Sequence, residues 1–163
     1  MFEVLGFYKF KKLNQLSKKK IFLQKYFIEN DIKGTLIISK EGINGTISGK
    51  PFNISFVNKK IKSLLKFNKF DSENLSKSSF QPFHKPKVKI KKEVVPMGLK
   101  IQNKAKKGNH LTPSKWNNLI KNKNTLVLDT RKPFEYEVGT FKKAINPKVK
   151  HFREFPKYLN KLD

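Results

Sequence analysis

Charged side chains follow directly on an apolar run near the C-terminal end of the chain. Thr125 to Leu128 is almost continuously apolar, typical of a strand buried on both faces, and Asp129 and Arg131 come straight after it. The carboxyl ends of such strands are where α/β folds bind ligands, so this pair, with Glu135 and Glu137 close behind, could help to form an active site. Asp129 and Arg131 could equally pair with each other and hold the loop.

Few other side chains offer catalytic chemistry. The chain has no cysteine, which excludes disulfides and thiolate zinc sites and suits a cytoplasmic protein. Its three histidines show no spacing typical of metal ligands, and no arrangement of serine, histidine and aspartate points to nucleophilic catalysis. We therefore expect no metal site, and the residues identify no cofactor.

A lysine-rich segment, Lys85 to Val95, offers a different kind of site. Lys87, Lys89 and Lys91 recur at every second position, so they share one face of a predicted strand whose other face is apolar. Such a row favours contact with nucleic-acid phosphates, although a solvated edge strand also uses lysine to prevent aggregation. The basic tract continues through Lys92, Lys100, Lys104, Lys106 and Lys107.

The glycine-rich segment Ser39 to Gly49 is a third candidate. Asn44 and Gly45, between two short β-rich runs, are a hairpin-turn signal because both residues accept a positive φ. The segment could be only a tight turn, or a loop whose backbone N–H groups meet a phosphate or a base. The RNA-binding candidates are therefore Gly42, Asn44, Gly45, Lys87, Lys89, Lys91 and Lys92.

The pattern of apolar residues predicts the scaffold that holds these candidates. Phe2 to Phe10 alternates as a strand does, and apolar residues at helical spacing follow over residues 13–27. Two short strands over 34–39 and 45–48, a helix that begins at Pro51 and a final strand over 85–95 complete the order. This β-α-β-β-α-β order is the ferredoxin-like pattern of an α+β fold. Its fourth strand could begin earlier, within 76–80.

A second domain is predicted after a basic linker, residues 97–111. Thr112 is a helix N-cap, Pro113 takes the first helical position, and Trp116, Leu119 and Ile120 form the stripe that we expect to be buried. The strand at 125–128 and another helix over 152–162 give an α/β pattern. One parallel strand and two helices cannot bury a sheet, so we expect residues 112–163 to be an incomplete and unstable domain, after a first domain at 1–96.

The net charge of the chain restricts the classes of partner that we expect it to bind. The formal net charge is +25, with 35 lysines, two arginines and only 12 acidic residues. Such an excess favours a polyanion, either nucleic acid or an anionic membrane surface, although solvated lysines can serve solubility alone. No apolar run is long enough to span a membrane, and the N-terminus has none of the marks of a signal peptide, so we expect a cytoplasmic protein.

Long segments of the chain resemble a known family. GTLIISKEGINGTISG, PFHKPKVKIKKEVVPMG, HLTPSKWNNLI and VLDTRKPFEYEVGTFKKAINP follow in order and are similar to the bacterial tRNA uridine-34 hydroxylases, which contain a rhodanese domain. The resemblance implies oxidation of the wobble uridine of tRNA to 5-hydroxyuridine with molecular oxygen as co-substrate. It also implies a catalytic cysteine on a rhodanese loop beyond Asp163, with Asp129, Arg131, Glu135 and Glu137 supporting that site.

Several hypotheses follow from the resemblance. This chain is the N-terminal portion of such an oxidoreductase and is inactive by itself, with tRNA as its partner and no catalytic residue of its own. Alternatively, it is a stand-alone basic RNA-binding module. It could also be one half of a split enzyme whose cysteine-bearing half is separately encoded, either a hydroxylase or a rhodanese-type sulfurtransferase.

Overall fold

The computed structural model describes residues 1–98 and 108–162. The chain forms two compact units, unit 1 (Met1–Val95) and unit 2 (Pro96–Asp163). Most of the predicted basic linker, with Lys100, Lys104, Lys106 and Lys107, lies outside the described residues. Within the described ranges, no helix combines the length and the apolar character needed to cross a lipid bilayer.

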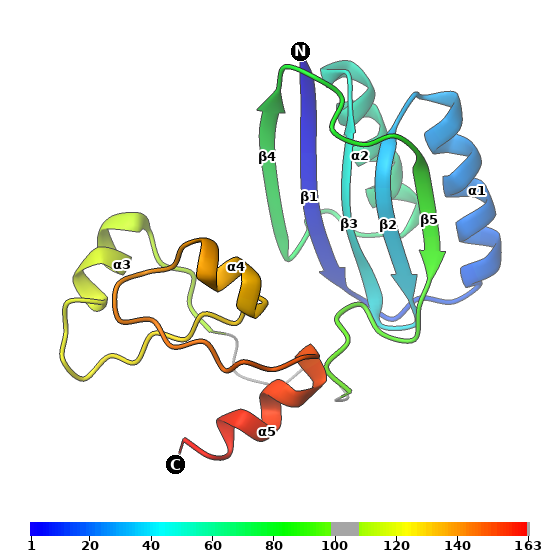
Figure 1. The fold of residues 1–163 in the computed structure, drawn as a ribbon. Coiled ribbons are helices and arrows are strands. Elements are labelled where there is room, and N and C mark those ends of the chain that lie inside the picture. The colour runs from blue at the N-terminus through cyan, green and yellow to red at the C-terminus, as the bar shows by residue number, and fades with distance from the viewer. Residues whose placement is uncertain (99–107, 163) are drawn as a thin grey trace. The chain divides into compact units, whose positions relative to one another are not determined.

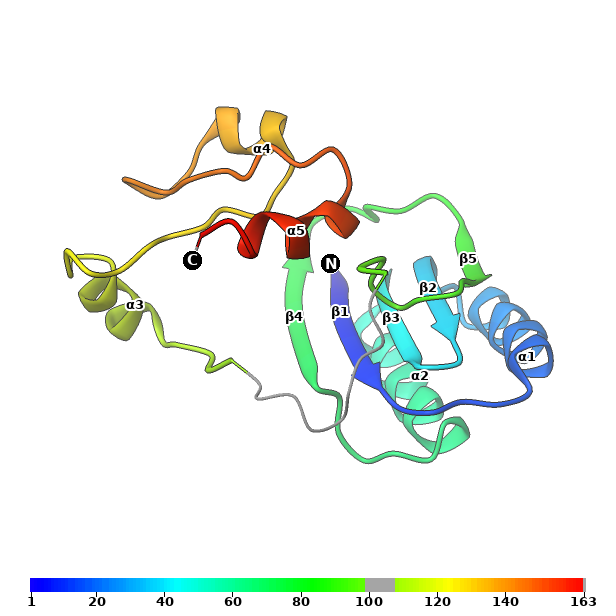
Figure 2. The same ribbon diagram turned by 90° about the horizontal axis from the view of Figure 1, so that it is seen from below.

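Unit 1 is a five-stranded sheet with two helices on one face (Figures 1 and 2). The sheet order is β4-β1-β3-β2-β5, and the pairs are antiparallel except for β2 with β5, which is parallel. The elements are β1 (Phe2–Phe10), α1 (Leu16–Glu29), β2 (Lys33–Ser39), β3 (Gly42–Gly49), α2 (Pro51–Leu64), β4 (Ser72–Ser78) and β5 (Pro86–Ile90). The predicted ferredoxin-like α+β arrangement is confirmed for this unit.

The core of unit 1 lies between the helices and one face of the sheet. Both helices form because their apolar residues recur at helical spacing, so that each presents one apolar stripe to the sheet. Alternate residues of β1, β2 and β3 meet those stripes. The buried side chains include Leu5, Phe7, Leu23, Phe27, Leu36, Ile38, Ile43, Ile47, Ile54, Val57 and Ile61.

The strand predicted over 85–95 is shorter and takes a different place in the sheet. It is β5, a fifth strand that pairs with β2, whereas the fourth strand is β4, which pairs with β1. The sequence allowed this fourth strand to begin within 76–80, whereas β4 begins earlier, at Ser72. β4 lies at an edge of the sheet and five of its seven residues are exposed, so no alternation of apolar residues marks it.

The turn predicted at Asn44 and Gly45 is also wrong. The β2–β3 hairpin turns at Lys40 and Glu41, and Asn44 and Gly45 lie within β3, paired with β1 on one side and β2 on the other. A Cβ at Gly45 would lie 2.9 Å from the Thr35 carbonyl oxygen and 3.2 Å from the Phe7 ring. Gly45 therefore serves a close approach of neighbouring strands and not a turn.

The outer edge of β5 is held by a side chain from α1. Gln24 donates from Nε2 to the Pro86 carbonyl oxygen at 3.1 Å and accepts the Val88 N–H at 2.8 Å. One amide thus takes up a backbone donor and a backbone acceptor that the β2 ladder leaves unused. This pairing fixes β5 to the helix as well as to the sheet.

Unit 2 contains short helices and little regular sheet. Its elements are α3 (Pro113–Leu119), α4 (Pro133–Val138), η1 (Phe152–Glu154) and α5 (Phe155–Leu159). Thr112 caps α3 as predicted, accepting the Lys115 N–H at 3.4 Å. The predicted strand at 125–128 is reduced to one parallel bridge, Leu128 with Ile145.

The stripe predicted on the first helix of unit 2 is not buried. None of the residues of α3 is buried, Leu119 is exposed, and Trp116 is only partly covered. The apolar residues of α3 therefore lack the packing surface that their spacing predicts.

We predict that Gly45→Ala destabilises unit 1 by about 1–3 kcal/mol, because its methyl group overpacks the junction of β1, β2 and β3. Gly6→Ala on β1 is the matched control, because a Cβ there meets nothing closer than 3.8 Å. Urea unfolding of the full chain, followed by circular dichroism, measures both variants. Equal stability of the two variants would contradict the close-approach explanation.

Candidate functional site

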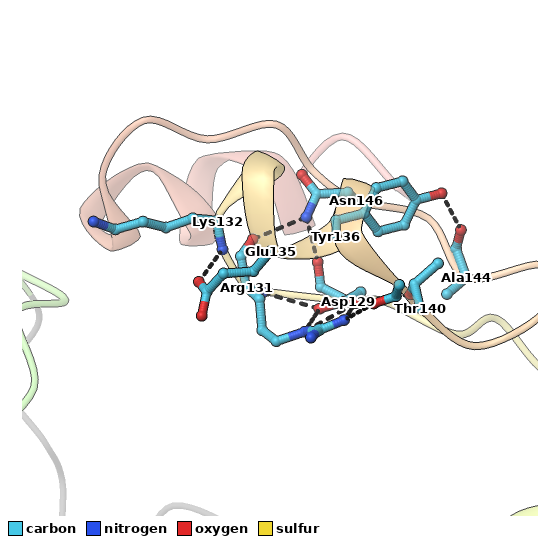
Figure 3. A network of polar contacts seen from close by, with 9 residues as sticks. Asp129, Arg131, Lys132, Glu135, Tyr136, Thr140, Ala144 and Asn146 are labelled. Atoms are coloured by element: carbon cyan, nitrogen blue, oxygen red, sulfur yellow. Dashed lines mark hydrogen bonds and ion pairs between the residues drawn. The ribbon is translucent and has the colours of Figure 1, made fainter. Parts of the chain in front are cut away.

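In unit 2, Asp129 and Arg131 form a close ion pair (Figure 3). Arg131 donates from Nε and Nη2 to both carboxylate oxygens of Asp129, with a shortest distance of 2.6 Å, and its backbone N–H also reaches Asp129 at 3.1 Å. Thr140 donates its hydroxyl to the same carboxylate at 2.8 Å, and Arg131 donates to the Gly139 carbonyl oxygen at 2.6 Å. The pair thus ties the end of the 125–128 run to the loop after α4.

The electrostatics of this pair keep the carboxylate ionised. Hydrogen bonds from the Arg131 side chain, and then from Thr140, hold the pKa of Asp129 well below its ordinary value, and the carboxylate in turn raises the pKa of Arg131. The Asp129 side chain is only 8% exposed, whereas that of Arg131 is 48% exposed. A carboxylate so engaged is a poor general base, and its role here is to fix the loop.

Asn146 fastens the other side of the same loop. Its amide donates to the backbone carbonyl oxygens of Asp129 and Arg131 at 2.9 and 2.8 Å, and its side-chain oxygen accepts the Lys148 N–H at 2.8 Å. The residue is 7% exposed. Sequence reasoning missed Asn146 and Thr140, and the only available signal was a polar side chain inside the otherwise apolar Ala144–Pro147 stretch.

The two glutamates predicted beside this pair do not join it. Glu135 accepts the Lys132 N–H at 3.0 Å and so caps the start of its own helix, α4. Glu137 is exposed, and its side chain makes no hydrogen bond or ion pair within the described part of the chain. Of the four predicted supporting residues, the structure therefore brings together only Asp129 and Arg131.

A hollow of about 490 Å³ lies beside the ion pair, within unit 2. Its lining includes Trp116, Leu128, Asp129, Arg131 and Thr140. The Trp116 indole N–H is buried without a hydrogen-bond partner in the described residues. The lining offers hydrogen-bond donors and an apolar wall, and the carboxylate that accepts the Thr140 hydroxyl is already bound by Arg131. In the ranges the structure describes, no three His, Asp or Glu side chains cluster to hold a metal ion.

In unit 1, the candidate lysines lie on and just after the edge strand β5. Lys87 and Lys89 are exposed and lie opposite Thr35 and Ile37 of β2, on the face of the sheet away from the helices, which we call the open face. Lys91 and Lys92 follow the end of the strand and are also exposed. Within the described residues none of these four lysines makes an ion pair.

The glycine-rich candidates lie on the neighbouring strand β3. Gly42 and Gly45 belong to a strand that is paired on both sides, so they do not form the predicted phosphate-binding loop. Asn44 lies on the open face, opposite Tyr8 and Ile37. An RNA-binding role for the three residues stays a prediction, and it has to act through the surface of a strand.

We predict that Asp129→Asn loosens the loop from Asp129 to Asn146, because the variant loses the charge-assisted bonds to Arg131. Since the pKa of Asp129 is lowered by folding, its stabilisation is complete above the unfolded-state pKa of about 4 and is lost as the pH falls below that value. Amide hydrogen exchange of Arg131 measures both effects. Glu137→Gln removes the same charge and should leave exchange unchanged; equal acid sensitivity of wild type and Asp129→Asn would contradict the prediction.

Comparison with known proteins agrees with the resemblance seen in the sequence. A relative named tRNA uridine(34) hydroxylase, from Pelagibacter ubique (strain HTCC1062), is 67% identical over 162 residues, which are 99% of this chain and 54% of the relative. The chain thus spans about half the length of that curated relative. The predicted resemblance to this family is confirmed.

Two solved structures have a distant likeness to part of this chain. The acylphosphatase from Bacillus subtilis is 12% identical with a TM-score of 0.40, over 54% of this chain and 98% of that one. The acylphosphatase from Coxiella burnetii is 9% identical with a TM-score of 0.38, over 54% and 90%. Neither likeness bears on function. The family described as "UPF0176 acylphosphatase like domain" matches residues 2–94, more than half of the chain, and this protein therefore belongs to that family.

Proposed function

We propose that this chain is the N-terminal portion of a tRNA uridine-34 hydroxylase and that unit 1 binds the tRNA. The observation that carries the proposal is the 67% identity over 162 residues to the relative of that name. The reaction of such an enzyme adds a hydroxyl group to the wobble uridine, with molecular oxygen as co-substrate, and takes place in the cytoplasm where tRNA is found.

The charge of the chain supports the tRNA part of this proposal. The net charge of +25 attracts a polyanion, and Lys87 and Lys89 carry charges that no carboxylate of the described chain neutralises. Lysine contacts to phosphates position an RNA and account for much of its affinity, but they do not read its sequence.

The Asp129–Arg131 pair supports a structural role for unit 2. Both side chains are engaged with each other and with Thr140, so the pair shapes one wall of the hollow that contains Trp116. The chain has no cysteine, so it does not supply the thiol that the family resemblance implies. We infer that this chain alone binds tRNA and does not hydroxylate it.

A complementation experiment tests the proposed function. This chain, and a chimera in which it replaces the matched 162 residues of the Pelagibacter relative, are expressed in bacteria that lack their own tRNA uridine-34 hydroxylase. Mass spectrometry of digested tRNA should find 5-hydroxyuridine with the chimera and none with the chain alone. A well-expressed chimera without product would overturn the proposed function, and product from the chain alone would overturn the inferred inactivity.

We predict that Lys87→Gln together with Lys89→Gln weakens tRNA binding by the full chain. Losing two phosphate contacts should reduce the slope of log K against log salt by about 2. Lys18→Gln with Lys20→Gln on α1 is the matched control, since it removes the same charge from exposed helix positions. Salt titrations by fluorescence anisotropy measure both. Equal losses in the two double variants would show that total charge, and not β5, sets the affinity.

A further inference from the structure

The open face of the unit 1 sheet is uncovered at its centre. Thr46, in the middle of the central strand β3, is exposed, and it lies between Gly6 of β1 and Thr35 of β2. Both helices pack on the other face, as Figure 1 shows. The connector between β4 and β5 crosses only one end of the sheet, where the Ser48 hydroxyl hydrogen-bonds the side chain of Gln81.

Two rows of side chains cross this face. In one row, strand pairing sets Tyr8, Asn44, Ile37 and Lys89 side by side on β1, β3, β2 and β5. The next row holds Gly6, Thr46, Thr35 and Lys87 in the same strands. With strands about 4.8 Å apart, each row runs from β1 to a lysine over roughly 14 Å.

An aromatic ring lies at one end of the first row. Tyr8 and Phe10 are two residues apart on β1 and so share the open face, and their ring centroids are 5.7 Å apart. Both are only partly buried. The ring offers a stacking surface, Asn44 offers a donor and an acceptor, and Lys89 offers a cation.

The carboxylates of the strands lie on the opposite face. Glu73 of β4 accepts hydrogen bonds from Asn58 and Lys62 of α2. Glu3 of β1 alternates in step with the buried Leu5 and therefore also points toward the helices. The strand residues of the open face thus include the cations Lys33, Lys87 and Lys89 and no acidic side chain.

We propose that the open face binds unpaired RNA nucleotides, with a base stacked on Tyr8, its edge hydrogen-bonded by Asn44, and the backbone phosphates drawn toward Lys87 and Lys89. Flat sheets with partly exposed rings bind splayed single-stranded bases, because every base offers an aromatic face. A duplex would offer phosphates but no free base for Tyr8. A protein partner would favour an apolar centre, whereas Thr35, Asn44 and Thr46 surround Ile37 with polar side chains here.

This inference rests on the proposed function and names the part of a tRNA that unit 1 contacts, an unpaired loop. It assigns different roles to the β5 edge and to the β1 strand of the open face. The lysines at β5 supply affinity that depends on salt, whereas the Tyr8 ring supplies affinity that depends on access to a free base.

Binding of two RNA probes to the full chain tests the proposal. The probes are an eight-nucleotide oligouridine and a twelve-base-pair RNA duplex, followed by fluorescence anisotropy. Tyr8→Leu should weaken oligouridine binding roughly 5- to 150-fold, the range for one stacked base, with little change in the salt slope or in duplex binding. Tyr8→Phe keeps the ring and should bind oligouridine nearly as the wild type does.

Controls separate stacking from misfolding and from other surfaces. Phe52→Leu removes a ring that is 79% exposed on α2 and should leave binding unchanged. Thr46→Glu places a carboxylate at an exposed site in the middle of the open face and should weaken oligouridine binding, whereas Thr46→Gln should not. If Tyr8→Leu fails to fold, the comparison of Thr46→Glu with Thr46→Gln still tests the proposal.

Two outcomes overturn the proposal. If Tyr8→Leu folds and Thr46→Glu is made, and neither changes oligouridine affinity, the open face is not the binding surface. If Phe52→Leu weakens binding instead, the RNA lies on the helices. Either result leaves the proposed hydroxylase function standing if the chimera is active, so the two proposals fail separately.

Discussion

Unit 1 depends on the close approach of three backbones at its central strand. β3 lies between β1 and β2, and the missing side chain of Gly45 lets the Phe7 ring and Leu36 pack against it. Because the strands are so close, the apolar stripes of α1 and α2 pack against a continuous apolar face of the sheet. The buried apolar packing is gathered on that one face, and the other carries the partly exposed Tyr8, Phe10 and Ile37 beside polar and basic side chains. The open face is thus a consequence of how the core is built.

Unit 2 relies on a different kind of interaction. Few of its described apolar side chains are buried, chiefly Val127 and Ala144, and the loop around Asp129 is held by hydrogen bonds to Arg131, Thr140 and Asn146. Charge-assisted bonds fix direction as well as distance, so a small number of them can define a loop without a large core. The same hydrogen bonds engage the Asp129 carboxylate, which the sequence suggested as part of an active site.

Local patterns in the sequence predicted the secondary structure correctly wherever the packing of the fold agreed with them. The apolar spacing of Leu23 and Phe27 marked α1, and the Thr112 cap marked α3. The pairing of Asp129 with Arg131 was one of two alternatives because the residues are neighbours. β4 was misplaced because an exposed edge strand needs no apolar residues, and the turn signal at Asn44 was overruled by strand packing. Thr140 and Asn146 are too far from Asp129 in sequence for any local pattern to connect them.

The hydrogen bonds from Gln24 to the edge of β5 affect how readily the protein aggregates at high concentration. Sheets polymerise through their edges, where unpaired backbone groups of one molecule can pair with those of another. At β5 the outward Val88 amide and Pro86 carbonyl are already occupied by Gln24, and at the opposite edge β4 carries serines and Lys77. Neither border of the sheet invites a second copy to add a strand. Edge-to-edge joining of the sheets into fibres is therefore disfavoured at both borders.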